Sequence, residues 1–228
     1  MAEPTIDRRP PVSGATRLAA VIGDPVRHSL SPTLLGAAFA ETGLDWTYVA
    51  LEVADGSVRG ALDGMRAFGI SGLSVTMPHK AAVAALVDRC VDDAAALGAV
   101  NCVVVEEGQL VGYNTDGGGF LDGLAHDSGM DVTGRRVVVL GAGGAARAVV
   151  QALAGAGASE VVVANRTLAR AEEAAAMAGS VGRAVELSLG HSDGRLEGAL
   201  VDALGGAELV VNATSVGMGG VSEMSTIH

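Results

Sequence analysis

The most informative side chain is Lys80, which ends the segment SVTMPHK (residues 74–80). It is the only lysine of the chain, and the other 14 of the 15 basic residues are arginines. A lysine can be tuned to release its proton near neutral pH, whereas a guanidinium stays charged. The alternative is a single lysine left by composition drift on a solvated surface. The residues around Lys80 must decide between these two explanations.

Two serines precede this segment in the motif GDPVRHSLSP. Ser29 and Ser31 flank Leu30 at the start of a helix-like stretch. Two hydroxyls at the beginning of a helix could together bind a carboxylate. Ser31 could instead cap the helix, since serine is a favoured N-cap residue and proline follows it. Capping would leave Ser29 unexplained, and the sequence keeps both interpretations open.

Three further polar residues could surround a hydroxylated substrate. Thr76 lies near Lys80 where an apolar strand runs into proline, and open α/β sheets bind ligands at such strand ends. Asn101 lies within an apolar stretch and Asp116 precedes a glycine run. Satisfying backbone groups and forming a turn are their structural alternatives. A lysine beside a carboxylate could accept the proton of an alcohol that is being oxidised.

A second site is indicated by RRVVVLGAGGAARA, where Gly141, Gly143 and Ala146 have the G-x-G-x-x-A spacing of dinucleotide-binding turns. The string is weak evidence in a chain with 33 glycines. Its position between an apolar strand and a helical pattern makes it stronger. The residues expected to contact the cofactor in this turn are Gly141, Ala142, Gly143, Gly144 and Ala145.

The end of the next strand, VVVANRTLAR, indicates which dinucleotide is bound. NAD-binding turns usually place Asp or Glu at this point, to bind the ribose 2′-hydroxyl. Here Asn165 and Arg166 occupy it, followed by Thr167 and Arg170. A guanidinium can hold a 2′-phosphate through paired hydrogen bonds. NADP is therefore favoured over NAD, with a solvated arginine beside an N-capping threonine as the alternative.

The elements that position these candidate residues are predicted by the hydrophobic pattern. Alternating apolar strands and alanine-rich helices indicate an α/β fold with a mainly parallel sheet. We expect strands at 17–23, 46–53, 69–77, 100–108, 135–141, 159–166 and 207–215. We expect helices at 31–43, 57–69, 79–98, 117–130, from 144 onward, and at 167–179. The predicted domains are 17–116, which would bind the substrate, and 117–228, a Rossmann-type dinucleotide-binding domain.

Composition excludes several classes of function. The formal net charge of −11 argues against nucleic-acid and anionic-membrane binding, and no apolar stretch is long enough to predict a membrane span. The five histidines and two cysteines lack metal-ligand spacing, so no metal site is predicted. We expect a soluble cytoplasmic protein acting on a small molecule. The sequence does not reveal its oligomeric state, and a homodimer is one open alternative.

Taken together, the motifs resemble those of the shikimate dehydrogenases. The resemblance covers roughly residues 18–218 and rests on five ordered blocks, which are GDPVRHSLSP, SVTMPHK, AVNCV with YNTDGGGF, GAGGAARA with ANRT, and NATSVGM. It implies a reversible, NADPH-dependent reduction of 3-dehydroshikimate to shikimate, in the biosynthesis of chorismate and the aromatic amino acids.

The resemblance also implies a role for each site residue. Ser29 and Ser31 would bind the substrate carboxylate, and Thr76, Asn101 and Asp116 its ring hydroxyls. Lys80, paired with Asp116, would be the catalytic proton acceptor and donor. The cofactor would contact the glycine turn and the segment 165–170. The segment 212–218, including Thr214 and Met218, would line the nicotinamide.

The chain departs from the family pattern at several positions. Leu35 and Gly36 replace the usual His-Asn, and Ser74 replaces a more usual Asn. The family continues beyond NATSVGM, whereas this chain stops at His228, which implies a C-terminally incomplete cofactor domain. The alternatives are an NAD-dependent quinate/shikimate dehydrogenase and a truncated, non-catalytic dinucleotide-binding protein. A folate-type methylene dehydrogenase is disfavoured by the HSLSP and NTD blocks.

Overall fold

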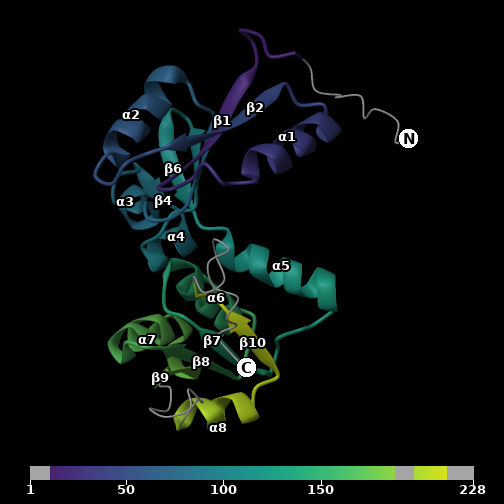
Figure 1. The fold of residues 1–228 in the computed structure, drawn as a ribbon, viewed down its shortest axis with the longest axis vertical. Coiled ribbons are helices and arrows are strands. Elements are labelled where there is room, and N and C mark those ends of the chain that lie inside the picture. Colours follow the sequence, from purple (N-terminus) through teal and green to yellow (C-terminus); the bar gives the residue numbers. More distant parts are fainter. Residues whose placement is uncertain (1–10, 188–197, 215–228) are drawn as a thin grey trace. The chain divides into compact units, whose positions relative to one another are not determined.

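The computed structural model describes residues 11–187 and 198–214. The chain divides into two compact units, Met1–Asn114 and Thr115–His228. Each unit contains one sheet with helices on both of its faces (Figure 1). The predicted α/β class is therefore confirmed.

The sheet of the first unit has the strand order β2-β1-β3-β5-β6-β4. Its strands are β1 (Arg17–Gly23), β2 (Trp46–Glu52), β3 (Gly72–Val75), β4 (Arg89–Cys90), β5 (Cys102–Glu106) and β6 (Gln109–Tyr113). Its helices are α1 (Ser31–Thr42), α2 (Val58–Phe68), α3 (Lys80–Ala84) and α4 (Asp92–Leu97). Strand β5 runs antiparallel to both β3 and β6, so this sheet is mixed.

The two faces of this sheet are covered differently. Helix α1 covers one face, where Leu35 and Phe39 pack against Val21 and Tyr48. Helices α2, α3 and α4 contribute to the core of the opposite face (Figure 1). Trp46, at the start of β2, lies beside Phe39 with 5.6 Å between the ring centroids. The guanidinium of Arg17 lies 4.4 Å from the centre of the Trp46 ring, a cation–π contact.

The prediction of one helix over 79–98 is wrong. The segment is divided into α3, the short strand β4 and α4. Helix α3 ends at Ala84, and beyond it Asp88 is bound to β6: its backbone N–H donates to Leu110 O (3.0 Å) and its carboxylate accepts from the N–H of Leu110 (2.7 Å). Pairing with β6 has therefore overridden the helix propensity of an alanine-rich segment.

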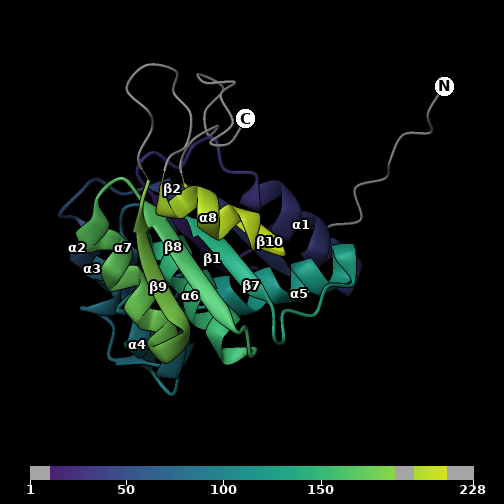
Figure 2. The same cartoon turned by 90° about the horizontal axis from the view of Figure 1, so that it is seen from below.

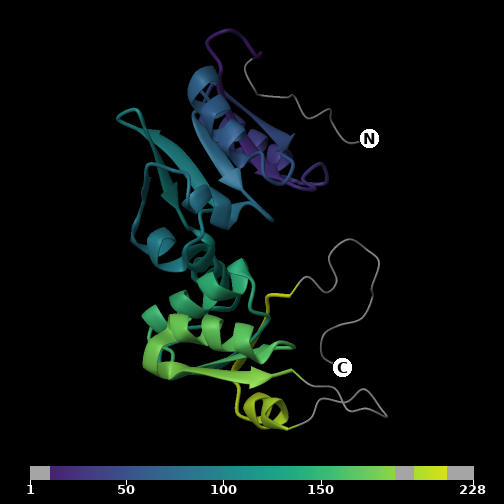
Figure 3. The ribbon, with the colours of Figure 1, turned by 90° about the vertical axis from the view of Figure 1, so that its left-hand side faces the viewer.

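The sheet of the second unit is parallel, with the order β10-β7-β8-β9. Its strands are β7 (Arg136–Leu140), β8 (Glu160–Asn165), β9 (Gly182–Glu186) and β10 (Leu209–Asn212). Its helices are α5 (Asp116–Ser128), α6 (Gly144–Gly155), α7 (Leu168–Ala175), the 3-10 helix η1 (Ala176–Val181) and α8 (Ala199–Gly205). Helices α6 and α7 cover one face and α8 the other, as Figures 2 and 3 show.

Candidate functional site

In the first unit, hydrogen bonds between loops bring the predicted residues to one edge of the sheet. Because β3 and β5 are antiparallel, the end of β3 adjoins the beginning of β5. The N–H of Val75 donates to Asn101 O (2.8 Å), and the N–H of Val100 donates to Lys80 O (3.0 Å). Thr76 directly follows β3. Thr76, Lys80 and Asn101 are therefore held together by the main chain, and all three are partly buried.

Gly23, at the end of β1, fixes the position of Thr76. A Cβ atom at Gly23 would lie 2.5 Å from Thr76 Cγ2 and 3.1 Å from Met77 O. The methyl group of Thr76 thus occupies the place that any side chain at residue 23 would need. Packing this methyl against β1 restricts the rotamer of Thr76 and thereby the direction of its hydroxyl.

The two serines of the first loop lie together. Ser29 Oγ and Ser31 Oγ are 3.1 Å apart, and the N–H of Ser31 donates to Ser29 Oγ (3.2 Å). Ser31 is the first residue of α1 and does not cap it, because Leu30 is the N-cap and no side chain caps this helix. The capping interpretation of Ser31 is therefore wrong. The paired hydroxyls lie beside a helix N-terminus, whose N–H groups and dipole favour an anion.

His79, immediately before Lys80, is a structural residue that sequence reasoning missed. It is 1% exposed, and its Nε2–H donates to Val53 O, 2.7 Å away. Val53 follows β2, and its N–H donates to Gly23 O (3.2 Å). His79 therefore joins the loops that follow β1, β2 and β3 at the residue next to the candidate catalytic lysine.

The last predicted residue of this group, Asp116, opens helix α5 in the second unit and is partly buried. It lies two residues beyond Asn114, whose side-chain N–H donates to Ala99 O (3.0 Å) in the first unit. On the other side of Asp116, a Cβ atom at Gly117 would lie 2.6 Å from Ala148 O on α6. The residues on both sides of Asp116 are thus held in place, Asn114 by its hydrogen bond and Gly117 by its close packing on α6.

The glycine turn of the second unit has the geometry of an anion-binding site. Gly141 adopts a φ of 104°, which favours glycine, and Gly143 is the N-cap of α6. Ala146 is fully buried, so α6 packs closely on the sheet. Gly143 and Gly144 are exposed, and a Cβ at either would meet nothing within 4 Å. Phosphate could therefore approach the N-terminus of this 12-residue helix.

The two arginines that favour NADP are available for binding. Arg166 and Arg170 are exposed, and neither forms an ion pair within the part of the chain that the structure describes. Asn165 Nδ2 donates to Thr167 O (3.0 Å), which shapes the turn between β8 and α7. Thr167 is the N-cap residue of α7 but makes no side-chain capping bond. These residues fit a 2′-phosphate.

The end of β10 lies against the glycine turn. A Cβ atom at Gly141 would lie 2.9 Å from Ala213 O. Asn212 Oδ1 accepts hydrogen bonds from the N–H (3.0 Å) and the hydroxyl (2.7 Å) of Thr214. Thr214 is therefore held next to the expected cofactor site. Met218 lies outside the described residues.

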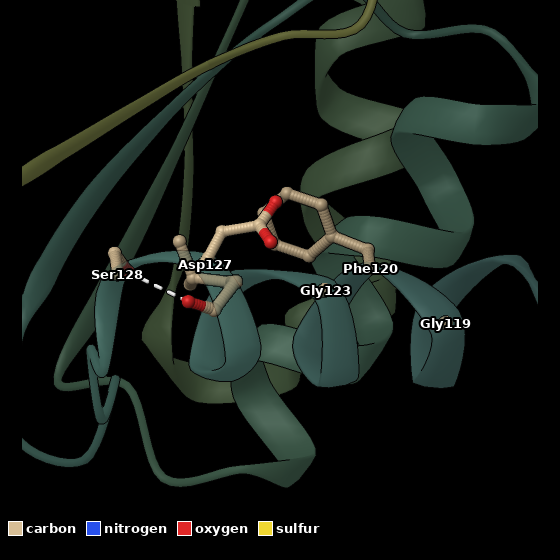
Figure 4. Close-up of a pocket in the computed structure, with 6 residues that line it drawn as sticks. Gly119, Phe120, Gly123, Asp127 and Ser128 are labelled. Carbon is tan, nitrogen blue, oxygen red and sulfur yellow. Dashed lines mark hydrogen bonds between the residues drawn. The ribbon is translucent and has the colours of Figure 1, made fainter. Parts of the chain in front are cut away.

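A surface hollow on α5 contains none of the predicted site residues. Its volume is about 370 Å³, and it is lined by Gly119, Phe120, Gly123, Leu124, Asp127 and Ser128 (Figure 4). The hydroxyl of Ser128 bonds internally to Leu124 O (2.6 Å). Its lining is mostly apolar and glycine-rich, with Asp127 as its one ionisable residue, and it is separate from the predicted site.

The described residues contain neither a membrane-spanning helix nor a metal cluster. No helix in these ranges is both long and apolar enough to span a bilayer. Within 11–187 and 198–214, no three His, Cys, Asp or Glu side chains are grouped so that they could bind a metal ion.

Comparisons with known proteins match both units. Residues 21–103 match the shikimate dehydrogenase substrate binding domain, and residues 123–217 match the shikimate / quinate 5-dehydrogenase family. The chain belongs to the shikimate dehydrogenase family. A shikimate dehydrogenase (NADP(+)) of Geobacter metallireducens is 47% identical over 208 residues, which are 91% of this chain and 72% of that protein.

Solved structures with a similar fold include enzymes named for different substrates. Shikimate 5-dehydrogenase of Thermus thermophilus, in complex with NADP(H) and shikimate, has a TM-score of 0.76 at 39% identity, covering 89% of this chain and 70% of its own. The 5-ketofructose reductase of a Gluconobacter strain has a TM-score of 0.75 at 32% identity, covering 90% and 71%. Because proteins with different substrates share the fold, the substrate must be argued from the site residues.

Proposed function

We propose that this protein is an NADP-dependent shikimate dehydrogenase, which reversibly reduces 3-dehydroshikimate to shikimate in the biosynthesis of chorismate and the aromatic amino acids. The observation that carries the proposal is the grouping of Thr76, Lys80 and Asn101 at one sheet edge. The family match over both units supports it. In this proposal residues 17–116 bind the substrate and residues 117–228 bind NADP.

Each side chain has a role in the proposed site. Ser29 and Ser31 hold the substrate carboxylate between their hydroxyls. Thr76 and Asn101 bind ring hydroxyls, and Asp116 binds the hydroxyl that is oxidised. The segments 141–145 and 165–170 hold the cofactor, and Thr214 and Met218 lie on its nicotinamide side.

Oxidation of the alcohol breaks one C–H bond and one O–H bond. The first hydrogen leaves as a hydride and the second as a proton, and each goes to a different acceptor. Bound NADP supplies the hydride acceptor. When shikimate is oxidised, Lys80 accepts the hydroxyl proton at Nζ, while the C–H bond breaks and its electron pair leaves with the hydrogen. In the reverse direction Lys80 returns the proton to the carbonyl oxygen. Asp116 helps to handle this proton.

A steady-state assay tests the proposal. We expect the protein to form NADPH from shikimate and NADP much faster than it forms NADH from NAD. Equal use of NAD, together with turnover of quinate, would instead identify a quinate/shikimate dehydrogenase. NADP binding without turnover would identify a non-catalytic dinucleotide-binding protein. Cytoplasmic location and a homodimer are further proposals, which cell fractionation and light scattering can check.

Arg166→Ser should weaken NADP binding specifically. Losing a charge-assisted hydrogen bond to the 2′-phosphate costs about 1.5–3 kcal/mol, which is about a ten- to hundredfold rise in KM for NADP. The KM for NAD should stay unchanged, because NAD lacks this phosphate. Arg59→Ser, at an exposed position of α2, is the matched control. An unchanged KM for NADP in the Arg166 variant would contradict the assignment.

Gly23→Ala should weaken shikimate binding by displacing Thr76. The new methyl group would lie 2.5 Å from Thr76 Cγ2, and such overpacking costs about 1–3 kcal/mol. We expect a higher KM for shikimate and an unchanged KM for NADP. Gly60→Ala on α2 is the control, because a Cβ there meets nothing within 4 Å. Equal KM values for shikimate in both variants would refute the role of Gly23.

A further inference from the structure

The hydroxyl of Tyr48 is buried, yet it has no hydrogen-bond partner among the described residues. Tyr48 lies on β2 and is 8% exposed. A buried polar atom without a partner costs about 1–3 kcal/mol. Native proteins contain few such atoms, and a bound water molecule is a common explanation. No role in the proposed reaction accounts for this hydroxyl.

The strand register places Tyr48 in a row with small residues of β1 and β3. Tyr48 pairs with Ala19 on β1, and Ala19 pairs with Gly72 on β3. The three residues form a row across the sheet on the face that α1 covers in part. Neighbouring strands are about 4.8 Å apart, so the tyrosine ring can extend over the small side chain of Ala19 toward β3. The next residue of β3 on the same face is Ser74.

There is room above β3 at this point. A Cβ atom added to Gly72 would meet only Val103 O, at 4.0 Å. The backbone of Gly72 is not among the positive-φ positions. Glycine is thus required there neither for its conformation nor to avoid a clash. The position of the missing side chain on this face of β3 is therefore open.

Electrostatic effects agree with this placement. Burial raises the pKa of the Tyr48 phenol, hydrogen bonding with the nearby Ser74 hydroxyl lowers it again in part, and Cys102 adds a smaller rise. The two hydroxyls are thus neighbours, although they lack the distance and angle of a direct hydrogen bond. Ser74 pairs directly with Cys102 on β5. The Tyr48 hydroxyl therefore faces Ser74 and Cys102, although it forms no direct hydrogen bond of normal geometry with either.

We propose that Tyr48 and Ser74 together bind an ordered water molecule, which positions the end of β3 for substrate binding. A buried water typically makes about three hydrogen bonds, and both hydroxyls can donate or accept. Ser74 and Thr76 project from the same face of the chain, two residues apart. The water therefore supports the residue that binds a ring hydroxyl, and this second part rests on the proposed function.

Tyr48→Phe tests the water site. A hydroxyl that binds water and a hydroxyl that is simply unsatisfied predict changes in Tm of opposite sign. If the hydroxyl binds water, its removal lowers Tm by about 2–6 °C. The KM for shikimate should then rise about threefold, with the KM for NADP and kcat unchanged. If the hydroxyl is simply unsatisfied, its removal raises Tm and leaves both KM values unchanged, and the proposal fails.

Two further variants separate the expected rise in the KM for shikimate from a general loss of stability. Gly72→Ala should fill the space and displace the water without removing either hydroxyl, so it should raise the KM for shikimate to the same extent. Tyr113→Phe is the control, because the Tyr113 hydroxyl bonds to Glu106 on the same sheet. It should lower Tm but leave the KM for shikimate unchanged. A KM that rises in the control alone, or stays constant in Gly72→Ala, overturns the positioning role.

A high-resolution crystal structure tests the water independently of activity. We expect one water molecule within hydrogen-bond distance of both Tyr48 Oη and Ser74 Oγ. A direct bond between the two hydroxyls, with no water between them, would overturn the proposal. If the protein binds this water but does not oxidise shikimate, the proposed function fails and the water site stands.

Discussion

Lys80→Ala should lower kcat for shikimate oxidation by about 10²–10⁴-fold, the usual contribution of a general acid–base residue. The affinity for NADP should be unchanged, because the lysine lies in the first unit and the proposed cofactor residues lie in the second. Steady-state rates and fluorescence titration with NADPH measure the two quantities separately. Loss of both together would indicate a folding defect.

Lys80→Arg distinguishes proton transfer from charge. The variant keeps the positive charge, but its guanidinium does not release a proton at physiological pH. We expect it to be as inactive as the alanine variant. Activity close to that of the unmodified protein would show that position 80 requires only a cation, and the proton-transfer mechanism would then be wrong.

Gly141→Ala should have the largest effect in the second unit. An alanine at a φ of 104° is strained by about 1–3 kcal/mol, and its methyl group would lie 2.9 Å from Ala213 O. The turn must shift away from β10, so the N–H groups that would bind the phosphates are displaced. We expect at least about a tenfold loss of NADP affinity, together with a lower Tm, measured by titration and thermal unfolding.

Gly155→Ala is the matched control for this prediction. It is the last residue of α6, at the opposite end of this helix from the glycine turn, and a Cβ there meets nothing within 4 Å. Alanine is the better helix former, so stability should be unchanged or about 0.5–1 kcal/mol higher. If Gly141→Ala behaves like this control, the turn does not require glycine and its role in binding is refuted.

Local sequence patterns predicted the second unit well. A strand, a glycine turn and a helix occur in the expected order. Val137–Leu140 is a short continuous apolar run that ends at glycines, as is typical of a buried parallel strand, and the longer alanine-rich segment after it is typical of a helix. The strand β9 was not predicted. Its segment GRAVE is short and partly polar, and it becomes a strand by pairing with β8. Such pairing depends on contacts distant in the sequence.

In the first unit, the contacts that shape the site could not be read from the sequence. Thr76 and Asn101 were selected by residue type and position. The space that Gly23 leaves for Thr76 depends on the pairing of β1 with β3. The bond from His79 to Val53 O joins positions 26 residues apart. A buried histidine and a strand-end glycine carry no distinctive pattern of their own, so only tertiary structure reveals what they do.

The placement of the aromatic residues determines what intrinsic emission can report. The single tryptophan, Trp46, and both tyrosines belong to the first unit, whereas Phe120 is the sole aromatic residue in the second. Intrinsic tryptophan and tyrosine fluorescence therefore follows denaturation of the half proposed to bind shikimate, and it changes little when the other half unfolds. Emission from bound NADPH would report on that other half, so a two-colour denaturant titration can show whether the halves melt together or one at a time.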